Sequence, residues 1–395
     1  MKPLLYSVLP RPPHPSRDGL AIRNYHLLAA LAERFEVRAF SLLDPDRAYG
    51  GGAVPPGVAV EWVPQRARAA RRPAAVLASL ATGEPYSAIL YRSRRLARRL
   101  ADACAERRPA WVVAHAYHVA PAAAAAGAPV WIDFHNLDST IWERMGETAS
   151  SAARRRFARG QAPRVRRLEQ TLLRHARGVS CVSRGDAAAL RELGAEEPVV
   201  VPNGVDLTRY AFRAESAPGE TVLFVGDLSW PPNAEGVRWL AERVWPAVRA
   251  RRPHARAEIL GRGAPPALER LARPDFVFLG EGDDTRPHWA RAAAAAVPLR
   301  AGGGTRLKIL EAAACGVPVV STRVGAEGLD FSPGELRIGD EPAAFAGALA
   351  ALLEDPAAAR RQAAAARARV EAAYGWERIG AAFAEALRRR AEPLG

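Results

Sequence analysis

The chain has 395 residues, 49% of them hydrophobic and 25% charged, which excludes extensive disorder and allows two or three domains with large cores. Its three cysteines, Cys104, Cys181 and Cys315, are too few and too scattered for a disulfide scaffold or a structural zinc site, and suit a reducing compartment. The net charge is +14 and comes mostly from arginine, which would attract phosphates but also serves ordinary solvated helix faces.

The N-terminus and the hydropathy pattern predict where the protein resides. No run of about 18 uncharged apolar residues occurs, so no membrane-spanning helix is expected. Met1 to Pro3 lead directly into a strand-like segment, which is not the pattern of a secretory signal. We therefore expect a cytoplasmic protein.

Short apolar, β-branched runs alternate with helical segments rich in Ala, Leu and Arg along the whole chain. Strands separated by helices indicate βαβ units, and hence parallel sheets. The predicted strands lie at 4–9, 37–43, 58–63, 111–116, 130–135, 179–183, 199–203, 221–226, 257–261, 276–280, 295–299 and 317–322.

The strand pattern restarts once. A turn-forming and polar stretch at 199–220 closes the first series, and a new strand begins at Thr221. The fold class predicted is α/β, with two Rossmann-like, doubly wound domains of parallel sheet facing a cleft. Open α/β sheets bind ligands at the carboxyl ends of their strands, so we expect the site there.

In the first half, polar groups follow four predicted strands. Asp18-Gly19 is a tight turn before a helix, and it would open onto the cleft. His135 ends a strand, where a substrate-binding role competes with a local turn role. His115 and His118 make a poor zinc pair because no third ligand lies nearby in sequence. Asp44-Pro45-Asp46 is a D-x-D motif of the metal-binding kind, but a proline turn is the favoured interpretation.

Strands of the second half also end in glycine-rich turns. Gly226 and Asp227 follow the first of them, Asn233 can cap the next helix, and Val237, Leu240, Val244 and Val248 form its apolar stripe. Gly261-Arg262-Gly263 lacks the third glycine of a dinucleotide fingerprint and is weak evidence. A Walker-type phosphate loop is missing from the sequence, which excludes that class of NTPase.

The segment 297–329 carries the most information. A strand is followed by three glycines, Gly302 to Gly304, and then by Thr305 as a candidate N-cap of a helix that ends at Cys315. Glycines before a helix N-terminus allow backbone N–H groups to approach an anion. Arg306 and Lys308 oppose the helix dipole, which an anionic ligand explains better than helix stability does. Glu311 could bind the vicinal hydroxyls of a sugar, or simply pair with Lys308 three residues earlier.

These motifs, in this order and spacing, resemble the GT-B-fold retaining glycosyltransferases of family 4, particularly the branch of bacterial exopolysaccharide assembly. The resemblance covers essentially the whole chain. The segment 297–329 is similar to the family's donor-site motif, and 374–387 resembles closing helices that cross back onto the first domain. It implies an acceptor domain at 1–205, a nucleotide-sugar donor domain at 206–373 and a returning helix at 374–395.

The resemblance also implies roles for individual residues. His135, Lys308 and Glu311 match its active-site positions, which touch the donor sugar, neutralise the leaving diphosphate and bind the ribose. Charged side chains take the place of a metal, so we expect no metal and no cofactor, only a UDP- or GDP-linked sugar as substrate. The implied donor-binding residues are Gly19, Gly226, Asp227, Arg262, Gly303, Gly304, Thr305, Arg306 and Leu307.

The sequence departs from the family at three positions. The first of two glutamates in the donor motif is replaced by Gly303, so other groups must contact the donor sugar. The usual Arg and Lys after the first strand of the donor domain are Asp227 and Asn233 here. Diphosphate charge must then be met by Lys308, Arg306 or Arg262.

The resulting interpretation is a metal-independent, retaining transferase of cell-surface glycan or exopolysaccharide synthesis, acting on a glycan or lipid-linked acceptor. Arginines of the first domain would contact anionic lipid at the inner membrane face. One alternative is a non-catalytic nucleic-acid-binding protein, motivated by the net charge of +14 but without a recognisable binding motif. Others are a nucleotide-sugar epimerase of the same fold and a metal-dependent transferase using Asp44 and Asp46.

Overall fold

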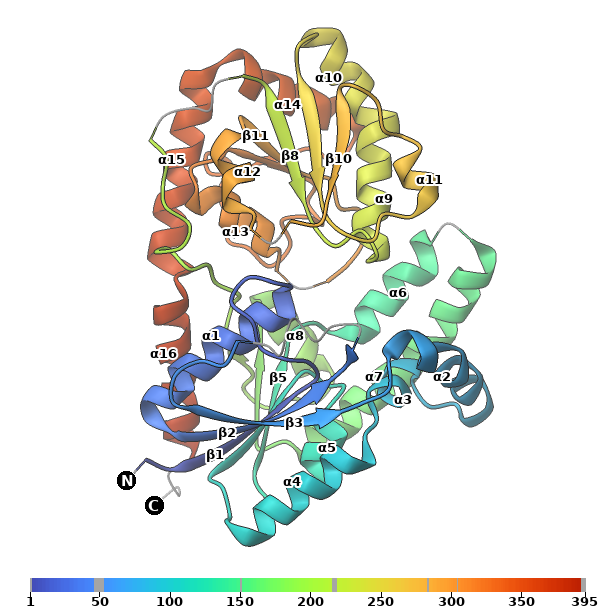
Figure 1. Cartoon of the computed structure of the whole chain (residues 1–395), viewed down its shortest axis with the longest axis vertical. Helices are drawn as coiled ribbons and strands as arrows, with labels where there is room; N and C mark the ends of the chain where they lie inside the picture. The colour runs from blue at the N-terminus through green and yellow to red at the C-terminus, as the bar shows by residue number, and fades with distance from the viewer. Residues whose placement is uncertain are drawn as a thin grey trace. The chain divides into compact units, whose positions relative to one another are not determined.

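The computed structural model describes residues 2–45, 53–149, 151–214, 219–282, 284–303 and 305–391. The chain divides into two compact units, each with its own parallel sheet (Figure 1). Unit 1 comprises Met1–Pro202 and Trp376–Gly395, and unit 2 comprises Asn203–Gly375. Two Rossmann-like units of parallel sheet confirm the predicted fold class.

The sheet of unit 1 has seven parallel strands in the order β3-β2-β1-β4-β5-β6-β7. Its central strands are apolar and buried along their whole length, because helices cover a parallel sheet on both faces. The strands are β1 (Leu4–Leu9), β2 (Glu36–Leu43), β3 (Val58–Pro64), β4 (Trp111–His115), β5 (Val130–Phe134), β6 (Gly178–Cys181) and β7 (Val199–Val200).

Four helices of unit 1 begin at a side chain that caps them. Asp18 accepts hydrogen bonds from the backbone N–H groups of Leu20 and Ala21, and so fixes the start of α1. Ser93, Ser151 and Ser183 cap three further helices in the same way. The helices are α1 (Gly19–Arg34), α2 (Arg68–Thr82), α3 (Tyr86–Tyr91), α4 (Arg94–Glu106), α5 (Ala120–Ala124), α6 (Asp138–Thr148), α7 (Ala152–His175), α8 (Arg184–Glu192) and α16 (Trp376–Ala391).

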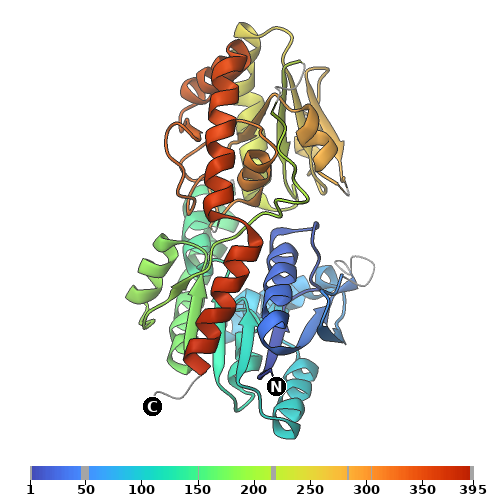
Figure 2. The same ribbon diagram turned by 90° about the vertical axis from the view of Figure 1, so that its left-hand side faces the viewer.

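The last helix, α16, belongs to unit 1 and packs against α1, as Figure 2 shows. The indole Nε1 of Trp111 donates a hydrogen bond to the carbonyl of Leu387 at 2.9 Å. The ring of Phe383 meets Trp131 edge to face, with 5.9 Å between centroids. Helix α16, near the end of the sequence, therefore forms part of the hydrophobic core of unit 1.

The sheet of unit 2 has six parallel strands in the order β10-β9-β8-β11-β12-β13. They are β8 (Thr221–Val225), β9 (Arg256–Leu260), β10 (Phe276–Gly280), β11 (Ala294–Val297), β12 (Val319–Ser321) and β13 (Arg337–Ile338). The sequence predicted all of these except β13, whose two residues are too few to form a pattern. The helices are α9 (Pro231–Trp239), the π-helical turn η3 (Leu240–Val244), α10 (Trp245–Arg251), α11 (Pro266–Glu269), α12 (Arg286–Arg291), α13 (Leu307–Ala314), α14 (Pro342–Glu354) and α15 (Pro356–Ala373).

Two predicted helix caps are wrong. The N-cap residue of α13 is Arg306 rather than Thr305, and it makes no side-chain capping bond. Asn233 lies inside α9, which starts two residues earlier at Pro231, since proline is well suited to the first helical turn. The apolar stripe from Val237 to Val248 is fully buried as predicted. None of the described helices is both long enough and apolar enough to span a bilayer.

Candidate functional site

The ammonium group of Lys308 occupies a narrow space at the carboxyl end of β8. It donates a hydrogen bond to Asn233 Oδ1 at 3.1 Å and lies 4.1 Å from the ring centroid of Phe224. A Cβ atom at Gly226 would stand 2.7 Å from this nitrogen, so any side chain there would displace the ammonium from its position. Asn233, which is inside α9 and not at its cap, holds the ammonium through a neutral amide oxygen.

Burial, together with the nearby charge of Arg306, lowers the pKa of Lys308 to about 7. Within the described part of the chain, no carboxylate forms an ion pair with this ammonium, whose partners are Asn233 and the Phe224 ring. A lysine held by a neutral amide and an aromatic face gains stability when an anion arrives, because the anion favours its charged form. The surroundings of Lys308 are therefore those of an anion-binding lysine.

The carboxylate of Glu311 is buried one turn further along α13. It accepts a hydrogen bond from Trp289 Nε1 at 3.3 Å, and Tyr210 faces the same group. Burial raises the pKa of Glu311 to about 7, although these donors and the charge of Lys308 act in the opposite direction. The alternative of a simple Lys308–Glu311 pair does not account for the geometry, because the two side chains are held by different partners.

The glycine loop before α13 has the backbone conformation that its sequence requires. Gly302 has a φ of 119°, which side-chain-bearing residues rarely adopt. The Arg306 guanidinium donates to the carbonyl of Gly303, and the buried hydroxyl of Thr305 lacks a hydrogen-bond partner among the described residues. Leu307 is the first residue of α13. Gly304 lies outside the described residues.

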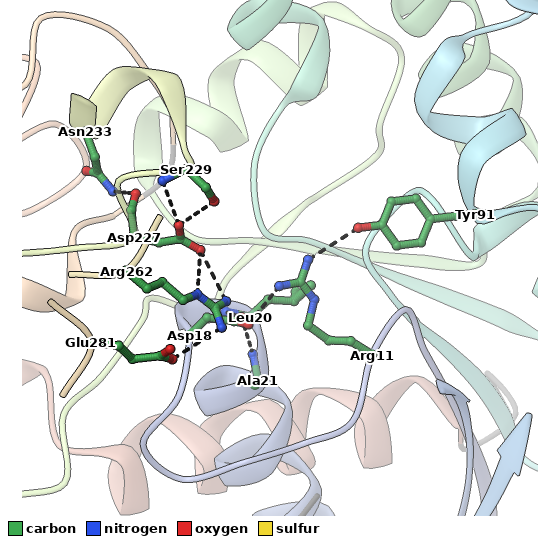
Figure 3. A network of polar contacts seen from close by, with 10 residues as sticks. All are labelled: Arg11, Asp18, Leu20, Ala21, Tyr91, Asp227, Ser229, Asn233, Arg262 and Glu281. Atoms are coloured by element: carbon green, nitrogen blue, oxygen red, sulfur yellow. Dashed lines mark hydrogen bonds and ion pairs between the residues drawn. The ribbon is translucent and has the colours of Figure 1, made fainter. Parts of the chain in front are cut away.

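Three charged side chains follow three adjacent strands of unit 2 and form a chain of ion pairs (Figure 3). Arg262, after β9, lies 3.2 Å from Asp227 Oδ2, after β8, and 3.5 Å from Glu281 Oε1, after β10. Asp227 also accepts a hydrogen bond from the backbone N–H of Ser229 at 2.9 Å. The charge of Arg262 is thus offset by carboxylates, which leaves Lys308 as the better candidate for meeting an anion.

In unit 1, His135 is held by a buried carboxylate. Its Nε2 lies 3.0 Å from Asp133 Oδ2, and Arg23 of α1 donates to both oxygens of Asp133, at 2.9 and 2.8 Å. Ser180 donates to the same carboxylate at 2.7 Å. Burial alone would raise the pKa of Asp133, but Arg23 and His135 hold it well below its usual range. Burial lowers the pKa of His135 more than Asp133 raises it, so the ring is neutral at neutral pH.

The sequence did not reveal this arrangement, since its members come from α1, β5 and β6. The one available signal was an acidic residue two positions before His135, on the same side of the strand. His115 completes a buried group with Asp133 and His135 in which ligand atoms lie within 4.8 Å of one another. This trio supplies the third ligand that the sequence did not offer to His115 and His118. However, the bidentate Arg23 already neutralises Asp133 and opposes a cation there.

Two further predicted positions have local structural roles. Gly19 is exposed and opens α1, whose first N–H groups already donate to Asp18. Asp44 is buried and accepts a hydrogen bond from the backbone N–H of Arg68, at the start of α2, at 3.2 Å. Asp46, the other half of that motif, lies outside the described residues.

Comparisons with known families agree with this division of the chain. Residues 18–204 match the family model described as glycosyl transferase 4-like domain. Residues 219–355 match the model described as glycosyl transferases group 1.

Among curated proteins, the glycogen synthase of Mycobacterium tuberculosis is 32% identical over 206 residues, which cover 49% of this chain and 48% of that protein. D-inositol 3-phosphate glycosyltransferase 2 of Catenulispora acidiphila is 34% identical over 223 residues, covering 48% of this chain and 50% of that protein. The chain thus spans about half the length of the curated relatives it matches.

Solved structures match over nearly the full length. Sucrose-phosphate synthase from Thermosynechococcus elongatus superposes with a TM-score of 0.71 at 20% identity, covering 98% of both chains. Anabaena Alr3699/HepE in complex with UDP and glucose gives 0.67 at 16% identity, covering 98% of this chain and 100% of that one. Two glycosyltransferase domain models thus match successive parts of the chain, residues 18–204 and 219–355, and the chain has the GT-B fold of the solved structures on which it superposes.

Proposed function

We propose that the protein is a metal-independent, retaining glycosyltransferase of family 4 that takes a sugar from a UDP- or GDP-linked donor. The acceptor is a glycan or a lipid-linked glycan, in exopolysaccharide or cell-surface glycan synthesis. The observation that carries the proposal is the pair of buried groups on α13, Lys308 with Asn233 and Glu311 with Trp289. A related structure of the same fold was solved with UDP and glucose bound, which supports a nucleotide-sugar donor.

Each unit would contribute different chemistry to the transfer. In unit 2, Lys308 stabilises the charge that develops on the diphosphate as the bond from the sugar to its oxygen breaks, and Glu311 accepts hydrogen bonds from the ribose hydroxyls. In unit 1, His135 binds the donor sugar as a neutral ring, oriented by Asp133. The new bond joins the same sugar carbon to an acceptor oxygen, whose proton leaves with the diphosphate product or with solvent.

The decisive experiment incubates the full chain with a panel of UDP- and GDP-sugars and candidate acceptors, with and without a chelator. We expect one donor to be consumed only when an acceptor is present, with the anomeric configuration retained in the product as read by NMR. Donor conversion without acceptor would indicate an epimerase instead, and activity abolished by the chelator would contradict metal independence. A protein that binds no nucleotide sugar and is retained by nucleic acid would overturn the proposal.

The ion pairs of Arg262 lead to a prediction about donor affinity. Asp227→Asn removes a negative charge next to Gly226 and hence near the Lys308 ammonium. We expect nucleoside diphosphate binding to tighten by about five-fold, which corresponds to roughly 1 kcal/mol of relieved repulsion. The measurement is isothermal titration calorimetry with UDP and GDP. Glu281→Gln is the matched control, with a smaller effect because its side chain is 52% exposed. Weaker binding by Asp227→Asn would show instead that Asp227 positions Arg262.

Contact with an anionic membrane is part of the proposal, and α2 supports it. Leu77 and Leu80 on this helix are 68% and 59% exposed, more than any other large hydrophobic residue described. Arg72 and Arg71 precede them on the same helix. Exposed leucines on a helix that also carries arginine are typical of a helix that lies in the lipid headgroup region.

We therefore expect the double variant Leu77→Ser/Leu80→Ser to bind anionic vesicles at least about ten-fold more weakly than the parent, since burying a leucine contributes about 1.5–3 kcal/mol. Co-sedimentation with vesicles measures this, and binding should also fall as salt rises. Ile338→Ser is the control, because this residue of unit 2 is 42% exposed but lies outside α2. Equal binding by parent and double variant would contradict membrane contact through α2.

A further inference from the structure

Unit 1 contains a second group of charged side chains, which the proposed donor chemistry does not use. Arg11 Nη2 donates to the phenol oxygen of Tyr91 at 3.3 Å, and the guanidinium of Arg68 donates to the same oxygen. The Arg68 guanidinium also stacks at 5.1 Å from the Tyr91 ring centroid, and the His118 ring lies 4.5 Å away from that ring. We call Arg11, Arg68, Tyr91 and His118 the basic cluster; Figure 3 shows its contact between Arg11 and Tyr91.

The basic cluster lies where an open α/β sheet binds its ligands. Arg11 follows the carboxyl end of β1, Arg68 that of β3, and His118 that of β4. Tyr91 ends the short helix α3, which brings the phenol to the same edge of the sheet. Side chains far apart in sequence thus converge at the carboxyl ends of three strands, the position in which such folds hold substrates.

The charges of the basic cluster are only partly balanced. Arg11 pairs with Asp18 at 2.8 Å, and His118 Nε2 lies 3.3 Å from Asp138. Arg71 adds a further positive charge nearby, bonded to Gln65 and to the carbonyl of Leu90. The Arg68 guanidinium donates to the Tyr91 phenol, as Arg11 does. A neutral phenol is a weak hydrogen-bond acceptor for two guanidinium groups.

The charged neighbours of Tyr91 lower the pKa of its phenol. Burial alone would raise the pKa of this phenol, but Arg11, Arg68 and His118 lower it to about 7. Arg71 and Tyr86 also face Tyr91. The side chains of Arg11 and His118 are only 11% and 18% exposed, so most of the surface of the basic cluster is shielded from water.

We propose that the basic cluster binds a phosphate group carried by the acceptor, so that the enzyme glycosylates a phosphorylated substrate. A phosphate offers several acceptor oxygens to the convergent donors of Arg11, Arg68 and Tyr91, and arginine matches its geometry through paired hydrogen bonds. The inference rests on the proposed function, because it assigns unit 1 to the acceptor. The same chemistry could serve the diphosphate of the donor, and the experiment separates these two sources.

The test measures binding of inorganic phosphate, glucose 6-phosphate and unphosphorylated glucose to the full chain by calorimetry, with and without saturating UDP. We expect both phosphates to bind and glucose not to, and UDP to leave phosphate binding unchanged. Arg68→Gln should weaken phosphate binding by about ten-fold or more, as expected for a charge-assisted hydrogen bond, and should leave UDP binding intact. Arg72→Gln is the control, an exposed arginine of the same helix.

A second readout does not depend on a variant that might unfold. Phosphate competes with ionised Tyr91 for the arginines and raises the pKa of the phenol, so at about pH 8 its binding should diminish the tyrosinate absorbance of the native protein. Tyr91→Phe should lose this signal and still bind phosphate. An absent signal together with no measurable phosphate binding would overturn the inference. Displacement of phosphate by UDP would assign the basic cluster to the donor instead, while failure of UDP itself to bind would count against the proposed function.

Discussion

Replacing Lys308 by methionine is expected to weaken nucleoside diphosphate binding by about 10- to 100-fold, the loss of one charge-assisted hydrogen bond worth about 1.5–3 kcal/mol. Turnover should fall further, by about 100- to 1,000-fold, because the ammonium also stabilises the charge that develops on the leaving group. Calorimetry with UDP or GDP gives the first number, and initial rates give the second. Methionine retains most of the apolar stem of the side chain but removes the ammonium, together with its contacts to Asn233 and the Phe224 ring.

The pH dependence provides a sharper form of the same test. The pKa of Lys308 is lowered to about 7 in the free protein, so the side chain is largely neutral above that pH and must take up a proton when a diphosphate binds. Affinity should therefore decline as pH rises above about 7 in the parent and stay flat there in Lys308→Met. Binding that is independent of pH in the parent would contradict the role assigned to Lys308.

The sequence offers an unusual way to observe this residue directly. Lys2 and Lys308 are the only lysines among the 56 basic residues. Reductive methylation with an isotope-labelled reagent would place NMR probes only on these two side chains and the terminal amine. The signal missing in Lys308→Met identifies Lys308, and its titration midpoint, expected near 7, should move upward when UDP is added.

The second large effect concerns stability. Asp133→Asn should lower the free energy of unfolding by about 3–5 kcal/mol, because it leaves the guanidinium of Arg23 buried without its counter-charge. Both side chains are almost completely inaccessible, at 1% for Arg23 and 0% for Asp133. Since the pKa of Asp133 is depressed, its stabilising contribution is present above its unfolded pKa and is lost as the pH falls through the folded value.

Urea denaturation measures the change, and an exposed ion pair of the same unit provides the control. Glu36 pairs with Arg107 at the surface, with side chains 51% and 50% exposed, so Glu36→Gln should change the free energy of unfolding very little. The double variant Arg23→Met/Asp133→Leu should recover most of the lost stability because neither charge remains buried. If Asp133→Asn were as mild as Glu36→Gln, the buried pair would not stabilise unit 1 as described.

The fold was largely predictable because its pattern is repeated many times. Each strand of a parallel sheet is buried on both faces and therefore appears as a short apolar run, as in β1, β4 and β5. Helix ends were less predictable. Asn233 is a good capping residue, but two prolines precede it and α9 begins with them. Thr305 is another, but α13 begins after Arg306 and has no side-chain cap.

The candidate site was predictable only where its residues lie close together in sequence. Lys308 and Glu311 share one helix with a glycine loop, and this local motif indicated an anion site. Arg23 and Trp289 gave no such indication, because they reach Asp133 and Glu311 through the topology of the sheet and across long sequence separations. The pairing of Arg262 with Asp227 was missed for the same reason, although both follow adjacent strands.

The placement of α16 in unit 1 has a consequence for how the protein is made. A ribosome delivers all of unit 2 once Gly375 has emerged, but unit 1 still lacks Phe383 and Leu387 at that moment. Until these residues are synthesised, Trp131 lacks its contact with the Phe383 ring, and Trp111 lacks its hydrogen bond to the carbonyl of Leu387. The half of the chain that is translated first is therefore the last to be completed, and a stop codon shortly after Gly375 would leave its core open.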